Sequence, residues 1–577
     1  MRSLQKRLGL FAIALFLSVF MAVGCTSVSH FLAAQDGVKT AIVPASASEV
    51  RSSKIPLGLG TNLAGIADWS SQIPFLDLMK SSRAWITQCN DDDPGCNDAW
   101  DTQEFDRLDL DEQGWVKSLP APEDSPRFTK VSTFLFNGLE RYPYDQYVVL
   151  YEGEGKLEYG FDAKQDEAAS QPGRDVINVA HGSGAVLLTV RETDPNRSGN
   201  YIRNIHVVPI AYEQTFRQQI FNPQFLERTR KFNALRFMDW MQTNNSEQKE
   251  WSDRPQVEDA TYAIQGVPLE IMVELANQLQ ANPWFNIPHQ ATDEYITSFA
   301  RLVKERLDPQ LKVYVEYSNE VWNWQFRQAH YALEQGQTRW GKDKGDAYTQ
   351  WYGMRAAQMS DLWKREFGDE GDRVIPIIAT QEAWQGLEEG ILNCPYWVAE
   401  GNRPCYQHGF TAYATAGYFS GDLGNPEKIS TVESWLREPD GGIGKAFEQL
   451  GMNGTNGNSV GDAAKSFEYH ANVANRYGLN LVAYEGGQHL TGREGIENNE
   501  AIVNFFTALN RHPRMGECYT ELLNQWKAAG GTLFMHFSDI GQPGKWGAWG
   551  ALESVLQTRS PKYDALIDFI DQNQLRK

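Results

Sequence analysis

Cysteine and histidine are scarce in this sequence, which has 6 cysteines and 10 histidines among 577 residues. No CxxC pair and no mixed cluster of histidines and cysteines offers the ligand spacing of a structural zinc site. His489 lies four residues after Glu485 and could be grouped with His536, but this spacing lacks a second ligand pair. We therefore expect neither a metal nor a cofactor.

Basic side chains are also in the minority, with 53 lysines and arginines against 74 aspartates and glutamates, a net charge of −21 and a pI of about 5.0. Such a chain repels nucleic acid and anionic lipid, so we expect no nucleic-acid partner and favour a neutral or cationic substrate. Hydrophobic residues make up 41% and aromatic residues 12%, enough for a sizeable core. The length fits a barrel with one further module.

The N-terminus has the features of a secretion signal over residues 1–25. Arg2, Lys6 and Arg7 precede the apolar run LGLFAIALFLSVFMAV, which is too short to span a bilayer comfortably with its flanks. The following AVGC is similar to a bacterial lipobox, with Cys25 as the lipidated residue; simple cleavage after FLAA is the alternative. Either way we expect an exported protein with a flexible Ser/Ala-rich tether over residues 26–54. Membrane contact is expected through the lipid anchor alone.

Export permits disulfides. Cys89 and Cys96 flank the turn-rich segment NDDDPG, and Cys394 and Cys405 bracket PYWVAEGNRP in the same way. We predict a bridge within each pair. Cys518 is then left as a buried free thiol.

The pattern of predicted strands and helices divides the chain into an inserted domain and a main domain. Residues 86–212 hold short alternating runs separated by Gly, Pro and Asp clusters, which predict an antiparallel β-sandwich. Residues 55–85 and 213–577 give eight apolar strand candidates alternating with helical segments, one of them at residues 69–85. This order predicts a (β/α)8 TIM barrel with an inserted sandwich domain. An open doubly wound sheet is the alternative, but no GxGxxG or GxxxxGK[ST] loop follows any strand.

Polar residues at the carboxyl ends of barrel strands are typical of catalytic sites, because the loops there form the active site. The segment YVEYSNEVWNW ends the fourth strand on Asn319 and Glu320, and LNLVAYEGGQ brings Glu485 to the end of the seventh. Strands four and seven are three positions apart in an eight-membered ring, so their ends face each other across the mouth. Opposed acids with Trp and Tyr around them indicate a glycosidase.

The motifs SNEVWN and AYEGG resemble those of the large clan of retaining glycoside hydrolases with (β/α)8 barrels, which includes the cellulase-like families. The resemblance implies that Glu320 is the general acid/base and Glu485 the nucleophile. Tyr413 or Tyr418 would hydrogen-bond the nucleophile, and Trp546 or Trp549 would floor the sugar site. The substrate-binding residues implied are Asn319 at the sugar 2-hydroxyl, Arg236 beside the nucleophile, His289 lining the sugar site, Tyr413, Trp546 and Trp549.

A retaining mechanism needs the two carboxyl groups about 5–5.5 Å apart, one protonated and one ionised. We expect Arg236 to lower the pKa of Glu485, and burial among Trp rings to raise the pKa of Glu320. Other interpretations stay open: a core ion pair of Arg236 with Asp239, a structural role for His289, packing roles for Trp546 and Trp549, and a peripheral or surface position for Glu382.

We thus expect an exported glycoside hydrolase that cleaves β-linked poly- or oligosaccharides with retention. A catalytically silent carbohydrate-binding barrel at the cell surface is the alternative. The inserted sandwich would either bind carbohydrate or shape one wall of the cleft.

Overall fold

The computed structural model describes residues 54–90, 93, 96, 99–120 and 127–575. The predicted signal segment 1–25, the lipidation site Cys25 and the tether up to residue 53 lie outside the described residues. Within the described part, no helix is both long and apolar enough to cross a membrane.

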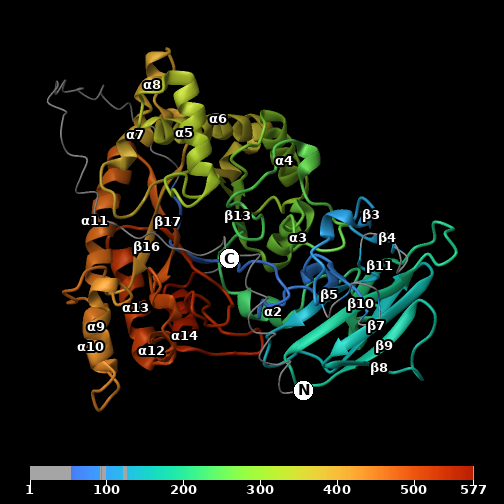
Figure 1. The fold of residues 1–577 in the computed structure, drawn as a ribbon. Helices are drawn as coiled ribbons and strands as arrows, with labels where there is room; N and C mark the ends of the chain where they lie inside the picture. Colours follow the sequence, from blue (N-terminus) through green and yellow to red (C-terminus); the bar gives the residue numbers. More distant parts are fainter. Residues whose placement is uncertain (1–53, 91–92, 94–95, 97–98, 121–126, 576–577) are drawn as a thin grey trace.

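Eight parallel strands of the described chain close into a barrel (Figure 1). The first strand pairs with the last, Gly58 opposite Leu533, so the sheet has no open edge and the doubly wound alternative is wrong. The predicted (β/α)8 barrel is therefore confirmed, with all eight strands in the predicted order. The barrel strands are β1 (Gly58–Asn62), β12 (Ala234–Arg236), β13 (Asn282–Ile287), β14 (Val313–Tyr317), β15 (Val374–Ala379), β16 (Ala412–Phe419), β17 (Asn480–Gln488) and β18 (Leu533–His536).

Helices connect the barrel strands. The helix α11 shows how the sequence sets its limits: Ser459 and Asp462 form a reciprocal capping box at its start, and Gly478 ends it in the left-handed conformation. The α-helices are α2 (Pro223–Thr229), α3 (Leu269–Leu279), α4 (Asp293–Arg306), α5 (Arg327–Trp340), α6 (Ala347–Phe367), α7 (Leu387–Asn393), α8 (Pro395–Ala399), α9 (Pro426–Trp435), α10 (Ile443–Leu450), α11 (Val460–Tyr477), α12 (Glu500–Arg511), α13 (Pro513–Ala528) and α14 (Pro561–Gln572).

The helix predicted at residues 69–85 is wrong in extent. This segment contains a single 3-10 turn, η1 (Leu78–Ser81). Pro74 disfavours a helical conformation in the residue before it, and Ile73 indeed adopts a positive φ of 41°. The segment instead runs as a loop from the end of β1 to the insert.

The insert forms two four-stranded antiparallel sheets, ordered β2-β5-β10-β7 and β11-β6-β9-β8, to one side of the barrel (Figure 1). The sheets pack on each other through rings such as Phe136 on β5 and Tyr147 on β6, with centroids 6.2 Å apart. This agrees with the predicted inserted sandwich. The strands are β2 (Ile86–Gln88), β3 (Asp109–Leu110), β4 (Val116–Ser118), β5 (Lys130–Asn137), β6 (Gln146–Glu152), β7 (Gly155–Phe161), β8 (Ala163–Gln165), β9 (Arg174–Val179), β10 (Ala185–Thr193) and β11 (Arg203–Pro209).

Buried polar contacts fix the sandwich to the segment that follows β1. Asp77 contacts the His206 ring at 2.7 Å and accepts a hydrogen bond from the Val207 amide at 3.0 Å. The Asn137 amide donates to the Asp68 carbonyl at 3.0 Å. The insert is thus held against the mouth-side loop of the first barrel strand.

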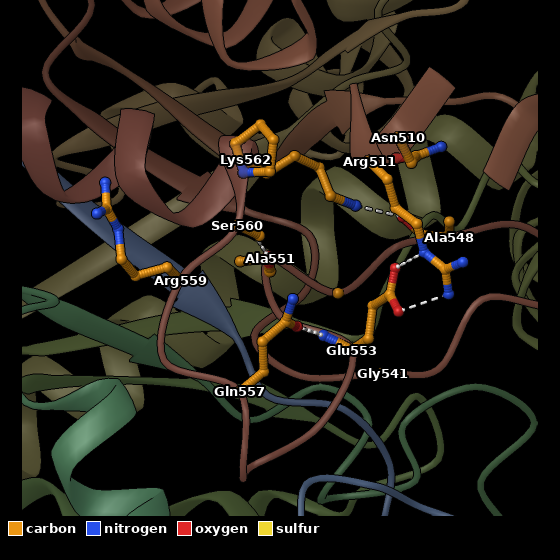
Figure 2. A pocket seen from close by; sticks show the side chains of 12 residues that line it. Asn510, Arg511, Gly541, Ala548, Ala551, Glu553, Gln557, Arg559, Ser560 and Lys562 are labelled. Carbon is orange, nitrogen blue, oxygen red and sulfur yellow. Dashed lines mark hydrogen bonds and ion pairs between the residues drawn. The ribbon is translucent and has the colours of Figure 1, made fainter. Parts of the chain in front are cut away.

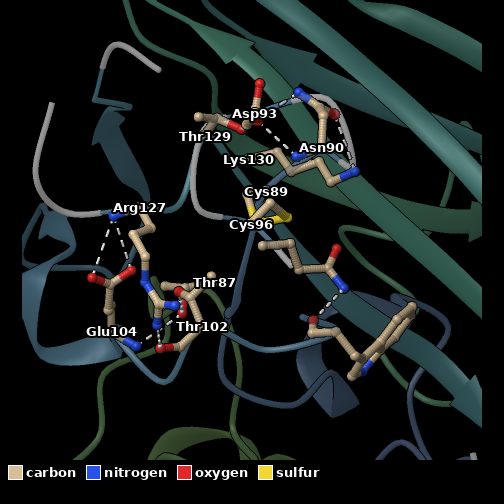
Figure 3. Close-up of a disulfide and its surroundings, with 12 residues drawn as sticks. Thr87, Cys89, Asn90, Asp93, Cys96, Thr102, Glu104, Arg127, Thr129 and Lys130 are labelled. Carbon is tan, nitrogen blue, oxygen red and sulfur yellow. Dashed lines mark hydrogen bonds between the residues drawn. A yellow bond between two sulfur atoms is a disulfide. The ribbon is translucent and has the colours of Figure 1, made fainter. Parts of the chain in front are cut away.

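Disulfides join Cys89 to Cys96 and Cys394 to Cys405, and Cys518 is free and buried among the described cysteines, so all three predictions are confirmed. Figure 3 shows the first bridge beside β5, where Thr129 donates to Asp93 and Lys130 donates to Asn90. The bridge and these bonds fix the start of this loop against the sheet.

Candidate active site

The fourth barrel strand delivers Glu320 through a strained turn. Ser318 and Glu320 have positive φ angles of 61° and 40°, a conformation that costs an L-residue about 1–3 kcal/mol. The Glu320 carboxylate accepts hydrogen bonds from the Tyr484 hydroxyl at 3.0 Å and from the Asn323 side-chain amide at 2.9 Å. Glu320 is only partly exposed. Strain of this kind is typical of functional sites, because the surrounding contacts must hold the residue in place.

A β-bulge on β17 positions the second acid. Thr415 pairs with Ala483 and Ala416 with Glu485, so Tyr484 is an extra residue in the ladder. The Tyr484 carbonyl accepts a hydrogen bond from the Asn62 amide at 3.1 Å, while its hydroxyl reaches Glu320. The bulge therefore lets adjacent residues of one strand act together: Tyr484 holds Glu320, and Glu485 is the second acid.

Arg236 is fully buried and connects the polar groups of the mouth. Its guanidinium lies 3.5 Å from Glu485 and 3.0 Å from Glu316, and donates to Asn319 at 2.8 Å and to Asn62 at 3.0 Å. Its ion pairs are thus with Glu316 and Glu485, and the alternative pairing with Asp239 is wrong. The arrangement places a permanent positive charge beside Glu485, as the sequence predicted.

Glu316, which the sequence analysis overlooked, is the first counter-charge of Arg236. One oxygen of its carboxylate accepts three hydrogen bonds, from Arg236, the Trp284 indole at 2.9 Å and the Asn286 amide at 2.8 Å. The available signal was a lone acid within the apolar strand segment VYVEY. The bonds from Trp284 and Asn286 hold the Glu316 carboxylate in place, and the carboxylate in turn fixes Arg236.

The predicted lowering of the Glu485 pKa is wrong in its net result. Burial and the facing Glu320 carboxylate raise the pKa of Glu485 well above its ordinary value, and the opposing charge of Arg236 does not outweigh them. Burial also raises the pKa of Glu320, against the hydrogen bonds from Asn323 and Tyr484. Two such interacting acids titrate as a pair, so the mouth retains one proton at a pH where free glutamates have lost both.

Of the two tyrosines considered from the sequence, Tyr418 is the one beside the acids. Burial and the nearby carboxylates of Glu485 and Glu320 raise the pKa of its hydroxyl well above the ordinary value. Its ring lies 6.1 Å from Trp549 and 5.4 Å from His489. The Tyr413 hydroxyl instead contacts the His470 ring on α11 at 2.8 Å, on the outer side of the strand. The role expected of Tyr413 beside Glu485 is therefore corrected to Tyr418.

The two tryptophans of the last loop contact each other. The Trp549 indole donates to the Trp546 carbonyl at 2.9 Å, and its ring packs on His489 at 4.9 Å. Trp549 is thereby next to Tyr418, whereas Trp546 lies under the Lys545 ammonium, 4.7 Å from its ring. Trp549 is the better placed of the two to contact a sugar.

His289 follows β13 and Glu382 follows β15, the barrel strands on either side of β14. The His289 ring packs against Tyr331 at 5.1 Å, and burial lowers its pKa to about 4, so it is a neutral side chain. Glu382 lies 3.5 Å from the Tyr418 amide, and burial raises its pKa to about 8. Glu382 is therefore close to the candidate site and not a plain surface residue.

A cavity of about 160 Å³ lies behind the last loop and contains neither glutamate of the pair (Figure 2). Lys562, whose pKa burial lowers to about 7, donates there to the Ala548 carbonyl at 2.5 Å. The same carbonyl accepts a hydrogen bond from Gln488 at 2.8 Å. These bonds tie the loop that carries Trp546 and Trp549 to both β17 and α14.

Among the described residues, no group of three or more His, Cys, Asp or Glu could hold a metal ion.

No protein-family model and no curated protein sequence matches the chain. Among solved structures, the chain is similar to a GH5-4 broad-specificity endoglucanase from Clostridum cellulovorans, with 12% identity, a TM-score of 0.31 and coverage of 59% of this chain and 84% of that one. A GH5 xyloglucan-specific endo-β-1,4-glucanase from a metagenomic library matches at 13% identity and TM-score 0.31, over 60% and 87% of the two chains. An exo-β-1,4-mannosidase from Opitutaceae bacterium strain TAV5 matches at 12% and 0.33, over 61% and 55%.

Such low similarity carries no conclusion about activity. The fold follows from the closed barrel itself, and the chemistry has to come from the residues at its mouth.

Proposed function

We propose that the protein is a retaining glycoside hydrolase that acts on β-linked poly- or oligosaccharides. The main support is the asymmetric pair at the barrel mouth. Glu320 and Glu485 are joined through Tyr484, and Arg236 contacts Glu485 alone of the two. Such a pair offers one carboxyl group to give a proton and one to attack, as double displacement requires.

In the first step the Glu320 carboxyl group protonates the glycosidic oxygen while the Glu485 carboxylate attacks the anomeric carbon. The bond to the leaving sugar breaks, and a glycosyl ester forms on Glu485. The positive charge of Arg236 favours the ionised form of Glu485 before attack, against burial and the Glu320 carboxylate. In the second step Glu320, now ionised, takes a proton from water, and the resulting hydroxide displaces Glu485 with overall retention.

The surroundings support a carbohydrate substrate. Asn319 holds its side-chain oxygen towards Arg236 and its amide towards Asn244, 3.1 Å away, which orients that amide for a sugar hydroxyl. Trp549 is partly exposed beside Tyr418, and Trp324 and Trp384, on the loops after β14 and β15, are 42% and 53% exposed. Open indole rings stack on the apolar faces of sugars. His289 and Trp546 remain proposed as further lining residues.

The test is hydrolysis of aryl β-glycosides, followed by a polysaccharide panel with reducing-end detection, with Glu485→Gln as the control. We expect turnover by the wild type and its loss in the variant. Glycan binding by both proteins without any hydrolysis would instead show the silent carbohydrate-binding barrel.

Export is part of the proposal, supported by the disulfides of the structure. If Cys25 is lipidated, Cys25→Ser should move the protein from the membrane fraction to the soluble fraction of a bacterial host. Unchanged partitioning would contradict the anchor.

A further inference from the structure

One sheet of the sandwich has an apolar outer face. Along β10, Val186, Leu188 and Val190 belong to the main core, and the alternate residues Ala185 and Leu187 point to the other side. These two pack with Phe134 in a separate small cluster. The cluster is separate from the core between the two sheets, and it occupies a face that is normally polar in a sandwich.

Exposed rings extend this cluster into a strip. Trp100 and Phe161 lie 6.2 Å and 5.7 Å from Phe134 and 6.1 Å from each other, and they are 41% and 45% exposed. The Arg83 guanidinium lies 4.7 Å above Phe134 and 5.8 Å from the ring of Trp69, which is 48% exposed. We call Trp69, Phe134, Trp100 and Phe161 the aromatic strip.

Specific contacts hold the residues of the strip in place. Gln88 on β2 donates to the Trp100 carbonyl at 2.9 Å, and the Cys89–Cys96 bridge closes the loop that leads to Trp100. Arg83 is fixed by Asp68, with a nitrogen 2.8 Å from a carboxylate oxygen of this buried residue. Its charge is thereby paired, so the strip presents exposed aromatic rings without an unpaired charge from Arg83.

One loop of the chain joins the strip to the barrel mouth. Trp69 and Asp68 belong to the loop after β1, whose first residues lie at the barrel mouth: the Ala64 carbonyl accepts from Trp240, and its amide donates to Asp539. The same loop is bonded to the end of β5 through Asn137. A polymer that leaves the mouth over this loop would pass Trp69, which shares the Arg83 guanidinium with Phe134 of the strip.

We propose that the aromatic strip is a second glycan-binding site, which holds an extended segment of a neutral polysaccharide outside the catalytic cleft. Aromatic faces without net charge suit the apolar faces of neutral sugar rings. The rings of Trp100 and Phe161 lie at 71° to each other, so they would contact a bound chain with one ring face and one ring edge. That the strip binds the same polysaccharide as the catalytic cleft rests on the proposed function. Glycan binding at the strip does not depend on it.

Binding is tested in the full chain with Glu485→Gln, so that no probe is degraded, by retardation in native gels containing hydroxyethylcellulose, xyloglucan, galactomannan or xylan. We expect retardation by at least one of these, and Trp100→Ala and Phe161→Ala should each weaken it about 2- to 10-fold. Phe105→Ala, an equally exposed ring of the sandwich outside the strip, is the matched control and should change nothing. Aryl glycoside turnover should be the same with and without the strip substitutions.

Unchanged retardation in the Trp100→Ala/Phe161→Ala double variant, or no retardation of the parent by any probe, would overturn the proposal. The proposal would also be overturned if the parent self-associates on light scattering and the strip substitutions abolish this self-association without weakening glycan binding. The strip would then be a protein interface. If strip-dependent retardation is found without any glycoside turnover, the strip stands and the catalytic proposal fails.

Discussion

Replacing Glu316 by glutamine removes one of the two negative charges that share Arg236. All three hydrogen bonds to Glu316 go to one oxygen, so the amide oxygen of glutamine can accept them and the packing is kept. Glu316 and Glu485 lie 3.0 Å and 3.5 Å from the same guanidinium, so their negative charges are close enough to repel each other. The two contacts place the charges at most about 9 Å apart, where at an effective dielectric constant of about 20 the repulsion is roughly 2 kcal/mol or more.

Because 1.4 kcal/mol corresponds to about one pKa unit, Glu316→Gln should move the acidic limb of kcat/KM down by about one pH unit. The sign follows from the repulsion: without the Glu316 charge, Glu485 ionises at lower pH, and the nucleophile becomes available earlier. The pH profile for an aryl β-glycoside measures this. Glu388→Gln, a buried glutamate that bonds Tyr469 away from Arg236, is the matched control and should leave the limb in place. An unmoved or raised acidic limb in Glu316→Gln would refute the charge network.

Other substitutions test single contacts of the site. Tyr418→Phe removes the hydroxyl that interacts with Glu485 and should lower kcat roughly 10- to 100-fold. Tyr413→Phe should stay within about two-fold, and equal effects would show that Tyr418 does not assist the nucleophile. The pKa of Glu382 is raised to about 8 in the fold, so its stabilising effect is full below pH 4.5 and is lost as the pH rises towards 8. The melting temperature of Glu382→Gln minus that of the wild type should therefore increase by about 1–3 °C from pH 5 to pH 8. If this difference does not change with pH, the burial of Glu382 is contradicted. Burial raises the pKa of Cys518 to about 12, so iodoacetamide should modify it only after unfolding; rapid labelling of the native protein would disprove its burial.

The barrel could be predicted from the sequence because parallel strands that are buried on both faces have nearly continuous apolar sequences. Glu320 and Glu485 could be found because each interrupts such a run at its carboxyl end. Glu316 could not be distinguished in this way, since an acid inside a strand has no positional signal until its partners Arg236, Trp284 and Asn286 are in place.

Tyr418 and Tyr484 needed the strand register. Tyr413 and Tyr418 are an odd number of positions apart on β16, so they point to opposite sides of the strand, but the sequence does not say which side faces the mouth. Tyr484 reaches Glu320 through a bulge that appears only when β17 is aligned with β16. The pKa of Glu485 depends on the balance of burial, Glu320 and Arg236, which residue types alone do not set.

The configuration of the azide product formed by Glu320→Ala tests the central claim most directly. Loss of the acid should still let an aryl β-glycoside with an acidic phenol glycosylate Glu485, and the ester should then accumulate because no base activates water. Added azide should relieve this block, and NMR of the product should show a β-glycosyl azide, with Glu485→Ala giving the α-azide under the same conditions. An α-azide from Glu320→Ala, or polysaccharide cleavage by that variant within a few-fold of the wild type, would contradict the assignment of Glu320 as acid/base and Glu485 as nucleophile.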